Sequence, residues 1–119
     1  MQSPEDLKVR TKRYAIRVIE FVNKIPRSIA GQVIEKQLVR CATSVGANYR
    51  SACRARSKAE FIAKLQITLE ESDESLYWME LLKELRILSD AELVDLVAEG
   101  NELTAIFVTA LKTARNRKQ

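Results

Sequence analysis

Helix breakers are scarce in this chain, which has only three glycines and two prolines among 119 residues. Because these two residue types interrupt helices and populate the turns of strand-rich folds, their scarcity favours long helices. Apolar residues make up 46% of the sequence and charged residues 30%. That apolar content is enough to offset chain entropy, and the length is typical of one domain. We therefore expect a single compact helical domain over residues 1–119.

Helix starts are marked by a serine followed three residues later by an acid, a pattern in which both side chains satisfy unpaired backbone donors. The pattern begins at Ser3, Ser57 and Ser89. Pro26 disfavours helical geometry at the residue before it, so Ser28 marks a fourth start. The expected helices span residues 4–23, 28–55, 58–88 and 90–114, and a basic tail spans 115–119. Their short connections force antiparallel neighbours, which predicts an all-α, antiparallel up-down-up-down four-helix bundle.

Each predicted helix carries one stripe of apolar residues at helical spacing, as expected for a bundle core. Gly100 falls on the stripe of the last helix, where it allows close approach. Gly46 interrupts the second helix, and the pattern around it favours continuity over a kink. Cys41 and Cys53 lie twelve residues apart on that helix, which would place their Cα atoms about 18 Å apart. They are predicted to be small core fillers and not a disulfide.

The helix expected over 58–88 departs from this pattern because it has a second apolar stripe on its opposite side. The helix expected over 4–23 repeats the departure more weakly. One bundle core cannot bury both sides of a helix, and such a surface usually marks a partner contact. We therefore predict a homo-oligomer; the alternative is that these are scattered surface hydrophobes. The predicted oligomer interface consists of Val9, Ile16, Ile67, Trp78, Leu81 and Leu85.

Charge is segregated along the chain. Residues 1–64 contain fourteen Lys or Arg and five Asp or Glu, whereas residues 65–111 contain two and eleven. Basic rows of this kind can neutralise phosphates; alternatively, they are solvated faces that pair with acidic helices of neighbouring subunits. No aromatic residues are interleaved with them. The candidate nucleic-acid-binding residues are Arg10, Arg13, Arg17, Arg50, Arg54, Arg56, Lys58, Arg115 and Arg117, with Lys118 also in the basic tail.

Catalytic signatures are missing from the sequence. Histidine, which is the commonest general base and metal ligand, does not occur. Three isolated glycines cannot form a phosphate-cradling loop. Glu70, Glu71, Asp73 and Glu74 could hold a divalent cation or act as acid and base, but such a run is more commonly a solvated or ion-paired helix face. We predict a protein that is not an enzyme and has no cofactor or metal.

A polar row runs beside the apolar stripe of the second helix and consists of Gln37, Arg40, Ser44 and Asn48. Polar groups this close to a core need partners. If the chain folds back near residue 56, Arg40 comes level with Asp73 and Glu74. We therefore expect Arg40 to form a partly buried pair with one of these acids, within a subunit or across an interface. The predicted structural polar network is Arg40, Ser44, Asn48 and Glu74.

Membrane and export signals are also missing. The longest runs without charge are nine residues, against roughly 18 for a membrane span. Pro4, Glu5 and Asp6 occupy positions where a signal peptide would be basic and then apolar. We expect a cytoplasmic protein with no membrane partner.

Three segments carry a family resemblance: QLVRCATSVGANYR over residues 37–50, RARSKAEF over 54–61 and DESLYW over 73–78. Together they closely resemble the 23S rRNA intervening-sequence protein family of bacterial four-helix bundles, whose relatives include the accessory variability determinants of diversity-generating retroelements. The resemblance covers essentially the whole chain. This chain differs from many relatives at residue 51, where it has a serine and they have an acid. The matching positions are Arg40, Ser44, Asn48, Arg56, Lys58 and Glu74.

The resemblance implies a homopentamer. For the retroelement members, it also implies a basic surface that binds RNA or DNA and contacts a reverse transcriptase. We therefore expect a non-catalytic pentameric accessory protein that binds structured RNA or other nucleic acid. The alternative is a protein-protein adaptor or assembly scaffold without nucleic-acid affinity.

Overall fold

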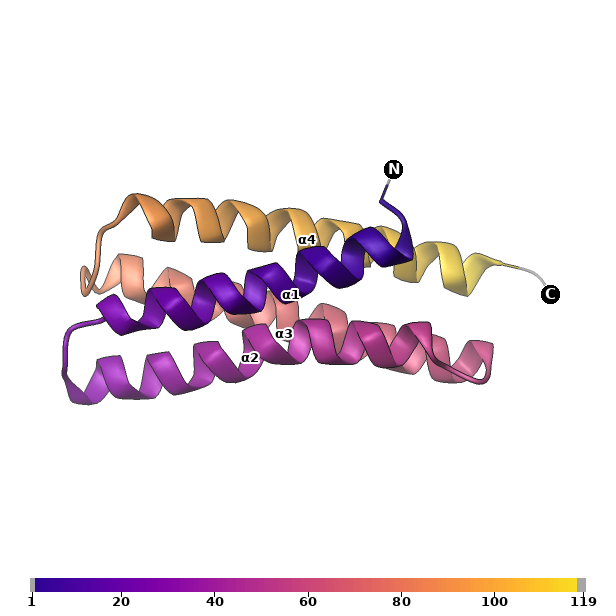
Figure 1. The fold of residues 1–119 in the computed structure, drawn as a ribbon, viewed down its shortest axis with the longest axis horizontal. Helices are drawn as coiled ribbons and strands as arrows, with labels where there is room; N and C mark the ends of the chain where they lie inside the picture. Colours follow the sequence, from indigo (N-terminus) through magenta and orange to yellow (C-terminus); the bar gives the residue numbers. More distant parts are fainter. Residues whose placement is uncertain (1, 118–119) are drawn as a thin grey trace.

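The computed structural model describes residues 2–117, and this part of the chain forms four long α-helices without strands. They are α1 (Pro4–Phe21), α2 (Ile29–Cys53), α3 (Lys58–Glu84) and α4 (Ala91–Asn116), with a 3-10 turn η1 (Val22–Lys24) after α1. The helices lie side by side in a rod of 51 × 25 × 21 Å, with both termini at one end (Figure 1). The predicted all-α antiparallel four-helix bundle is confirmed.

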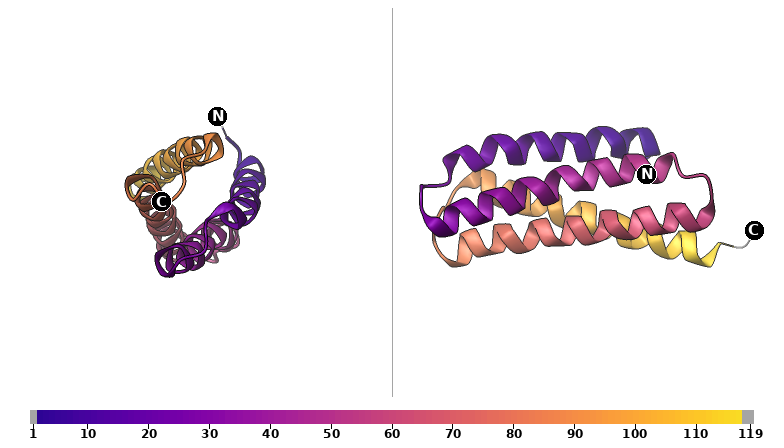
Figure 2. Two further views of the ribbon diagram at one scale, coloured as in Figure 1. Left: turned by 90° about the vertical axis from the view of Figure 1, so that its left-hand side faces the viewer. Right: turned by 90° about the horizontal axis from the view of Figure 1, so that it is seen from below.

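The order of the helices around the bundle determines which surfaces are adjacent. α1 packs mainly on α2 and α4, and α3 also packs mainly on α2 and α4. Consequently, α1 and α3 occupy diagonal positions, as the end-on view shows (Figure 2). The basic helix α1 therefore has the acidic helix α4 on one side and the basic helix α2 on the other.

Three of the four predicted capping residues are confirmed, although α2 begins at Ile29 and not at 28, and α4 begins at Ala91 and not at 90. Ser3, Ser28 and Ser57 each accept a hydrogen bond from a backbone N–H in the first turn of their helix. The fourth prediction was wrong by one residue, because Asp90 and not Ser89 caps α4. Two good capping side chains are adjacent there, and the carboxylate of Asp90 accepts the bond from the second residue of the helix.

The helix ends differ more from the prediction. α3 ends at Glu84 instead of residue 88, because Arg86 takes the left-handed conformation with φ of 56°. The backbone N–H of Arg86 donates to the carbonyl of Lys83, and that of Ile87 donates to Leu82, which is the bond pattern of a Schellman motif. The other ends differ by two residues: α1 at Phe21 and not 23, α2 at Cys53 and not 55, and α4 at Asn116 and not 114.

The predicted core stripes are largely buried. Tyr14, Phe21, Leu38, Leu65 and Phe107 are among the large side chains with almost no exposed area. α2 is continuous through Gly46, as expected. The two cysteines are unpaired, Cys41 buried and Cys53 half-buried, in agreement with their predicted role as fillers. Phe61, Leu69 and Val97 continue the stripes of α3 and α4 at helical spacing but are only partly buried.

The core also contains hydroxyl groups that the apolar pattern did not predict. The Tyr14 hydroxyl lies 2.7 Å from Ser75 Oγ, and Ser75 Oγ donates to the carbonyl of Ser72 at 2.6 Å. Because the only hydroxyl proton of Ser75 is used in the bond to the Ser72 carbonyl, Tyr14 must be the donor to Ser75. Ser72 Oγ in turn lies 2.7 Å from Thr104 Oγ1. Every buried side-chain nitrogen or oxygen within residues 2–117 has a hydrogen-bond partner.

None of the helices in the described part of the chain is long and apolar enough to span a membrane.

Candidate nucleic-acid interface

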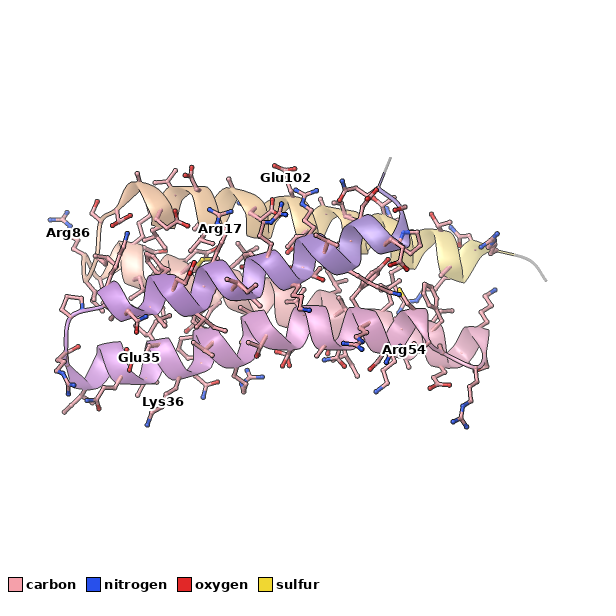
Figure 3. All side chains as sticks on the ribbon, in the orientation of Figure 1. Arg17, Glu35, Lys36, Arg54, Arg86 and Glu102 are labelled. Atoms are coloured by element: carbon pink, nitrogen blue, oxygen red, sulfur yellow. The ribbon has the colours of Figure 1, made fainter. Side chains whose placement is uncertain are left out.

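One row of cations on α1 is neutralised by α4. Arg10 Nε and Nη2 donate to the two carboxylate oxygens of Glu99 at 2.7 Å each, and Nη2 also reaches Glu102 at 2.9 Å. Arg17 pairs with Glu92 at 3.0 Å. The hydrogen bonds that Arg10 donates to Glu99 are the main reason why the pKa of Arg10 is raised. Figure 3 shows Arg17 and Glu102 on the side where α1 meets α4.

Lys24 completes this row on η1. It pairs with Asp90 at 3.4 Å. Arg10, Arg17 and Lys24 are each seven residues apart, so they share one side of the helix. The positive charge of this row is therefore matched by carboxylates of the α4 segment.

The opposite side of α1 lines a groove with α2, of about 420 Å³. Lys8 and Lys12 stand on the α1 rim, and Arg50 and Arg54 stand on the α2 rim. Lys8 pairs with Glu5 at 3.1 Å. Within residues 2–117, the other three cations make no ion pair, and no acidic residue lines the groove. This α1–α2 groove therefore holds a concentrated, uncompensated positive charge.

Small residues explain why this hollow exists between two packed helices. Gly46 lies against Thr11, because a Cβ built at Gly46 would be 3.4 Å from Thr11 Oγ1. The helices thus approach closely at this point. The groove is otherwise lined by Val9, Ala15, Thr43 and Ala47, whose short side chains leave its floor open while the longer cations rise at its rims.

Four further predicted cations gather near the α2–α3 connection. Arg56 is exposed directly after α2. Lys58 donates to the backbone carbonyl of Arg117, and Arg115 donates to Gln66 Oε1 at 2.8 Å. Arg54 lies on this half of α2 (Figure 3), so these residues extend the basic surface beyond the groove.

The structure therefore divides the predicted nucleic-acid-binding residues. Arg50 and Arg54 line the groove, whereas Arg10 and Arg17 face α4. Arg13 is exposed and lies outside the groove lining, and Lys118 lies outside the described residues.

Lys8 and Lys12 were not singled out from the sequence. Their spacing of four residues on the side of α1 opposite the paired row was the signal that could have identified them.

The predicted pairing of Arg40 with Glu74 is confirmed, but the pair is more exposed than expected, since the two side chains are 46% and 40% exposed. Arg40 Nη2 lies 2.5 Å from Glu74, and its Nη1 lies 3.1 Å from Glu71. Glu74 also accepts from Trp78 Nε1 at 3.1 Å. The hydrogen bond from Trp78, followed by those from Cys41 and Arg40, lowers the pKa of Glu74. The guanidinium therefore joins α2 to α3.

The rest of the predicted polar network is separate. Asn48 Nδ2 donates to the backbone carbonyl of Ser44 at 2.9 Å. That bond lies within α2, so within residues 2–117 no hydrogen bond between side chains connects Ser44 or Asn48 to Arg40 or Glu74. The four residues thus form one pair between helices and one local bond.

The acidic run contains one cluster with the donor atoms for a metal, formed by Cys41, Glu71 and Glu74 within 4.8 Å of one another. Both carboxylates are already bound to Arg40. Burial, followed by the contact with Glu74, raises the pKa of the Cys41 thiol to about 12, which keeps the thiol protonated at neutral pH. A neutral thiol beside two engaged carboxylates is a poor metal site. This geometry is that of the ion-paired helix face favoured by the sequence pattern.

The predicted oligomer-interface residues lie on the diagonal helices α1 and α3. Val9 and Ile16 are half-exposed or more on α1, at 56% and 50%. On α3, Ile67 and Leu85 are exposed, whereas Trp78 and Leu81 are half-buried against the core. The second apolar stripe of α3 is thus partly covered within one chain, and the rest of it faces outward.

Comparisons with known proteins show which proteins share this sequence pattern and this architecture. Residues 5–109 match the family described as 23S rRNA-intervening sequence protein. A crystal structure described as a protein with unknown function from the S23 ribosomal protein family of Bacteroides thetaiotaomicron VPI-5482 is 30% identical. That similarity covers 92% of this chain and 98% of the other, with a TM-score of 0.83. No curated protein matches the chain. The chain therefore belongs to the 23S rRNA-intervening sequence protein family.

Proposed function

We propose that this protein is a non-catalytic, homo-oligomeric accessory protein that binds RNA or another nucleic acid through the α1–α2 groove. The main support for the proposal is that some cations form ion pairs within the chain whereas others do not. Arg10 and Arg17 are neutralised by α4, whereas Lys12, Arg50 and Arg54 make no ion pair within residues 2–117. A cluster of uncompensated cations attracts a polyanion and releases its counterions.

The family supports RNA as the class of polyanion, because its description refers to intervening sequences of 23S rRNA. The basic composition, with a net charge of +4 and pI of about 9.2, points the same way. The resemblance to accessory variability determinants adds a reverse transcriptase as a proposed protein partner. The proposed setting is the cytoplasm, where ribosomal RNA is found.

Self-assembly is proposed from the exposed apolar residues that lie outside the groove, namely Ile16 on α1, Ile67 on α3 and Leu85 directly after α3. Two different faces at diagonal positions favour a head-to-tail contact, and such contacts form a ring when the rotation between neighbouring subunits closes. The charges beside them are complementary, since Arg13 flanks Ile16 on α1 whereas Glu70 lies one turn from Ile67 on α3. We propose the pentamer that the resemblance implies.

Nucleic-acid binding is tested by titrating a labelled structured RNA at two salt concentrations and measuring fluorescence anisotropy. The variant Arg50→Glu/Arg54→Glu should bind at least about tenfold more weakly, because two phosphate contacts become repulsive. The control is Lys36→Glu/Lys83→Glu, which makes the same charge change at exposed positions outside the groove; Lys36 lies toward the other end of α2 (Figure 3). Equal losses in both variants would contradict a role for the groove, and absent or salt-independent binding by the wild type would contradict the function.

Assembly is tested by sedimentation velocity of the wild type and of Ile16→Asp. We expect a defined oligomer that dissociates when a charge enters the proposed contact. Val94→Asp is the control, because Val94 is a similarly exposed apolar residue, at 65%, on α4. A wild type that stays monomeric at high concentration would contradict self-assembly. An oligomer without RNA affinity would favour the protein-protein scaffold instead.

A further inference from the structure

The lining of the α1–α2 groove defines which part of a nucleic acid it can contact. We propose that it binds the phosphodiester backbone of a duplex and does not read bases. This inference rests on the proposed function and specifies its ligand. It follows from the chemistry of the lining, the width of the bundle and the location of the aromatic residues.

The neutral part of the lining offers a single hydrogen-bonding side chain to a base edge. Val9, Ala15, Gly46 and Ala47 have none. Thr43 has a hydroxyl that donates its proton to the backbone carbonyl of Val39 at 2.8 Å, so it could accept a hydrogen bond from a base but not donate one. The lining lacks the Asn, Gln, Asp and Glu side chains that contact adenine and cytosine edges. Four cations remain as ligand-binding groups.

Those cations could in principle contact guanine, but the shape of the bundle prevents them from reaching it in a duplex. The groove is shared by α1 and α2, which pack side by side in the bundle. The major groove of B-form DNA is about 12 Å wide, and that of A-form RNA is narrower still. A surface two helices wide is about 20 Å across, so it does not enter either groove. The accessible groups of a duplex are therefore its phosphates.

Unpaired bases would find no stacking surface beside the groove. Tyr14, Phe21 and Tyr49, the aromatic residues of α1 and α2 in the described chain, are all buried. Tyr77 is exposed, but it lies beside Trp78 on α3, diagonal to α1 and near the acidic Glu74. Proteins that prefer single strands depend on such stacking. Without it, the higher charge density of a duplex is the stronger attraction.

The cation spacing fits a line of phosphates. Lys8 and Lys12 are four residues apart, as are Arg50 and Arg54, which places each pair about 6 Å apart along its helix axis. The two pairs face each other across the groove. A backbone lying between them could contact all four cations, with Lys8 exchanging its exposed ion pair with Glu5, which is 82% exposed, for a phosphate. Four phosphate contacts would give a log-log salt slope of about 3.6 on duplex.

The inference is tested with two RNA duplexes of equal length and unrelated sequence, and with a single-stranded oligouridine of the same length. The full-length protein is titrated at several salt concentrations. We expect the two duplexes to bind within about twofold of each other and the single strand to bind more weakly. Arg50→Gln/Arg54→Gln should lower the duplex slope by about 1.8, whereas Lys36→Gln/Lys83→Gln should leave it unchanged.

The outcomes separate this inference from the proposed function. Three results would contradict the proposal that the groove contacts the phosphodiester backbone of a duplex. They are tighter binding of oligouridine, a tenfold difference in affinity between the duplexes, and an unchanged salt slope in Arg50→Gln/Arg54→Gln. Salt-dependent binding would still support nucleic-acid binding in those cases. If no probe binds, both the proposed function and this inference are wrong.

Discussion

Arg10 and Glu99 are joined by two parallel hydrogen bonds of 2.7 Å each across the contact between α1 and α4. Both side chains are about four-fifths buried, at 22% and 19% exposure. This fork-to-fork geometry is the strong form of an ion pair. It stabilises the contact between the first and last helices, and it removes Arg10 from the cations available to a ligand.

Arg10→Ala should destabilise the fold by about 2 kcal/mol, because it leaves the carboxylate of Glu99 partly buried without a cation. Urea denaturation followed by circular dichroism measures the free energy of unfolding. Lys24→Ala is the control; its pair with Asp90 is 3.4 Å long and half-exposed, so its loss should cost below about 1 kcal/mol. Equal losses of unfolding free energy in the two variants would contradict the importance of the bidentate ion pair between Arg10 and Glu99.

Gly46→Ala and Gly100→Ala should change stability in opposite directions. A Cβ at Gly46 meets its nearest atoms at ordinary distances, beginning with Thr11 Oγ1 at 3.4 Å, so the higher helix propensity of Ala should stabilise by about 0.5–1 kcal/mol. A Cβ at Gly100 would lie 2.8 Å from Leu76 and 3.0 Å from the Tyr14 hydroxyl. Overpacking there should cost about 1–3 kcal/mol. Thermal unfolding of both variants tests the contrast, and a shift of the same sign in both would refute it.

Ser75→Ala should cost more stability than Tyr14→Phe. Removing Ser75 Oγ leaves the buried Tyr14 hydroxyl without its acceptor, a loss of about 1–3 kcal/mol. Tyr14→Phe removes the donor while Ser75 keeps its bond to the Ser72 carbonyl, so about 1 kcal/mol is expected. The double variant should be less destabilised than the sum of the single variants. A double-mutant cycle showing simple additivity would mean that the two hydroxyls are not coupled.

The fold was largely predictable because its determinants are local. Ser3, Ser28 and Ser57 act as caps through residues within one turn, and the core stripes follow from helical periodicity alone. The end of α3 was not predictable in the same way, since Arg86 adopts the left-handed conformation usually taken by glycine. Nothing in the local sequence distinguishes Arg86 from a residue that continues the helix.

The candidate site was only half predictable because ion pairing is a tertiary property. Arg17 and Arg50 look alike in the sequence, yet Glu92 neutralises Arg17, and Arg50 faces a groove without acids. In an antiparallel up-down-up-down bundle, the last helix lies beside the first. Matching Arg10 and Arg17 with Glu99 and Glu92, which share the same spacing of seven, would have revealed the pairing before the structure.

Acid should destabilise the protein partly through Glu74. Hydrogen bonds from Trp78, Cys41 and Arg40 hold the pKa of Glu74 below its ordinary value of 4.5. A carboxyl whose pKa is lower in the folded state contributes stability that is present at neutral pH and is lost as the pH falls from about 4.5 through the folded-state pKa. Glu74→Gln should therefore be less stable at pH 7 and lose less stability on acidification. Urea denaturation between neutral pH and about pH 3 measures both effects.

Asp73→Asn is the matched control for Glu74→Gln. Asp73 is the adjacent acid on α3, is exposed, and makes no ion pair within residues 2–117. Its replacement should leave the dependence of stability on pH close to that of the wild type, because it breaks no ion pair within residues 2–117. If Glu74→Gln retains the full acid sensitivity, the loss must come from other carboxyls, of which Asp6 and Asp90 also have lowered pKa values through backbone hydrogen bonds at their helix caps. In that case, the bond network around Arg40 would be an incidental surface contact and not the electrostatic link between α2 and α3 that its short distances indicate.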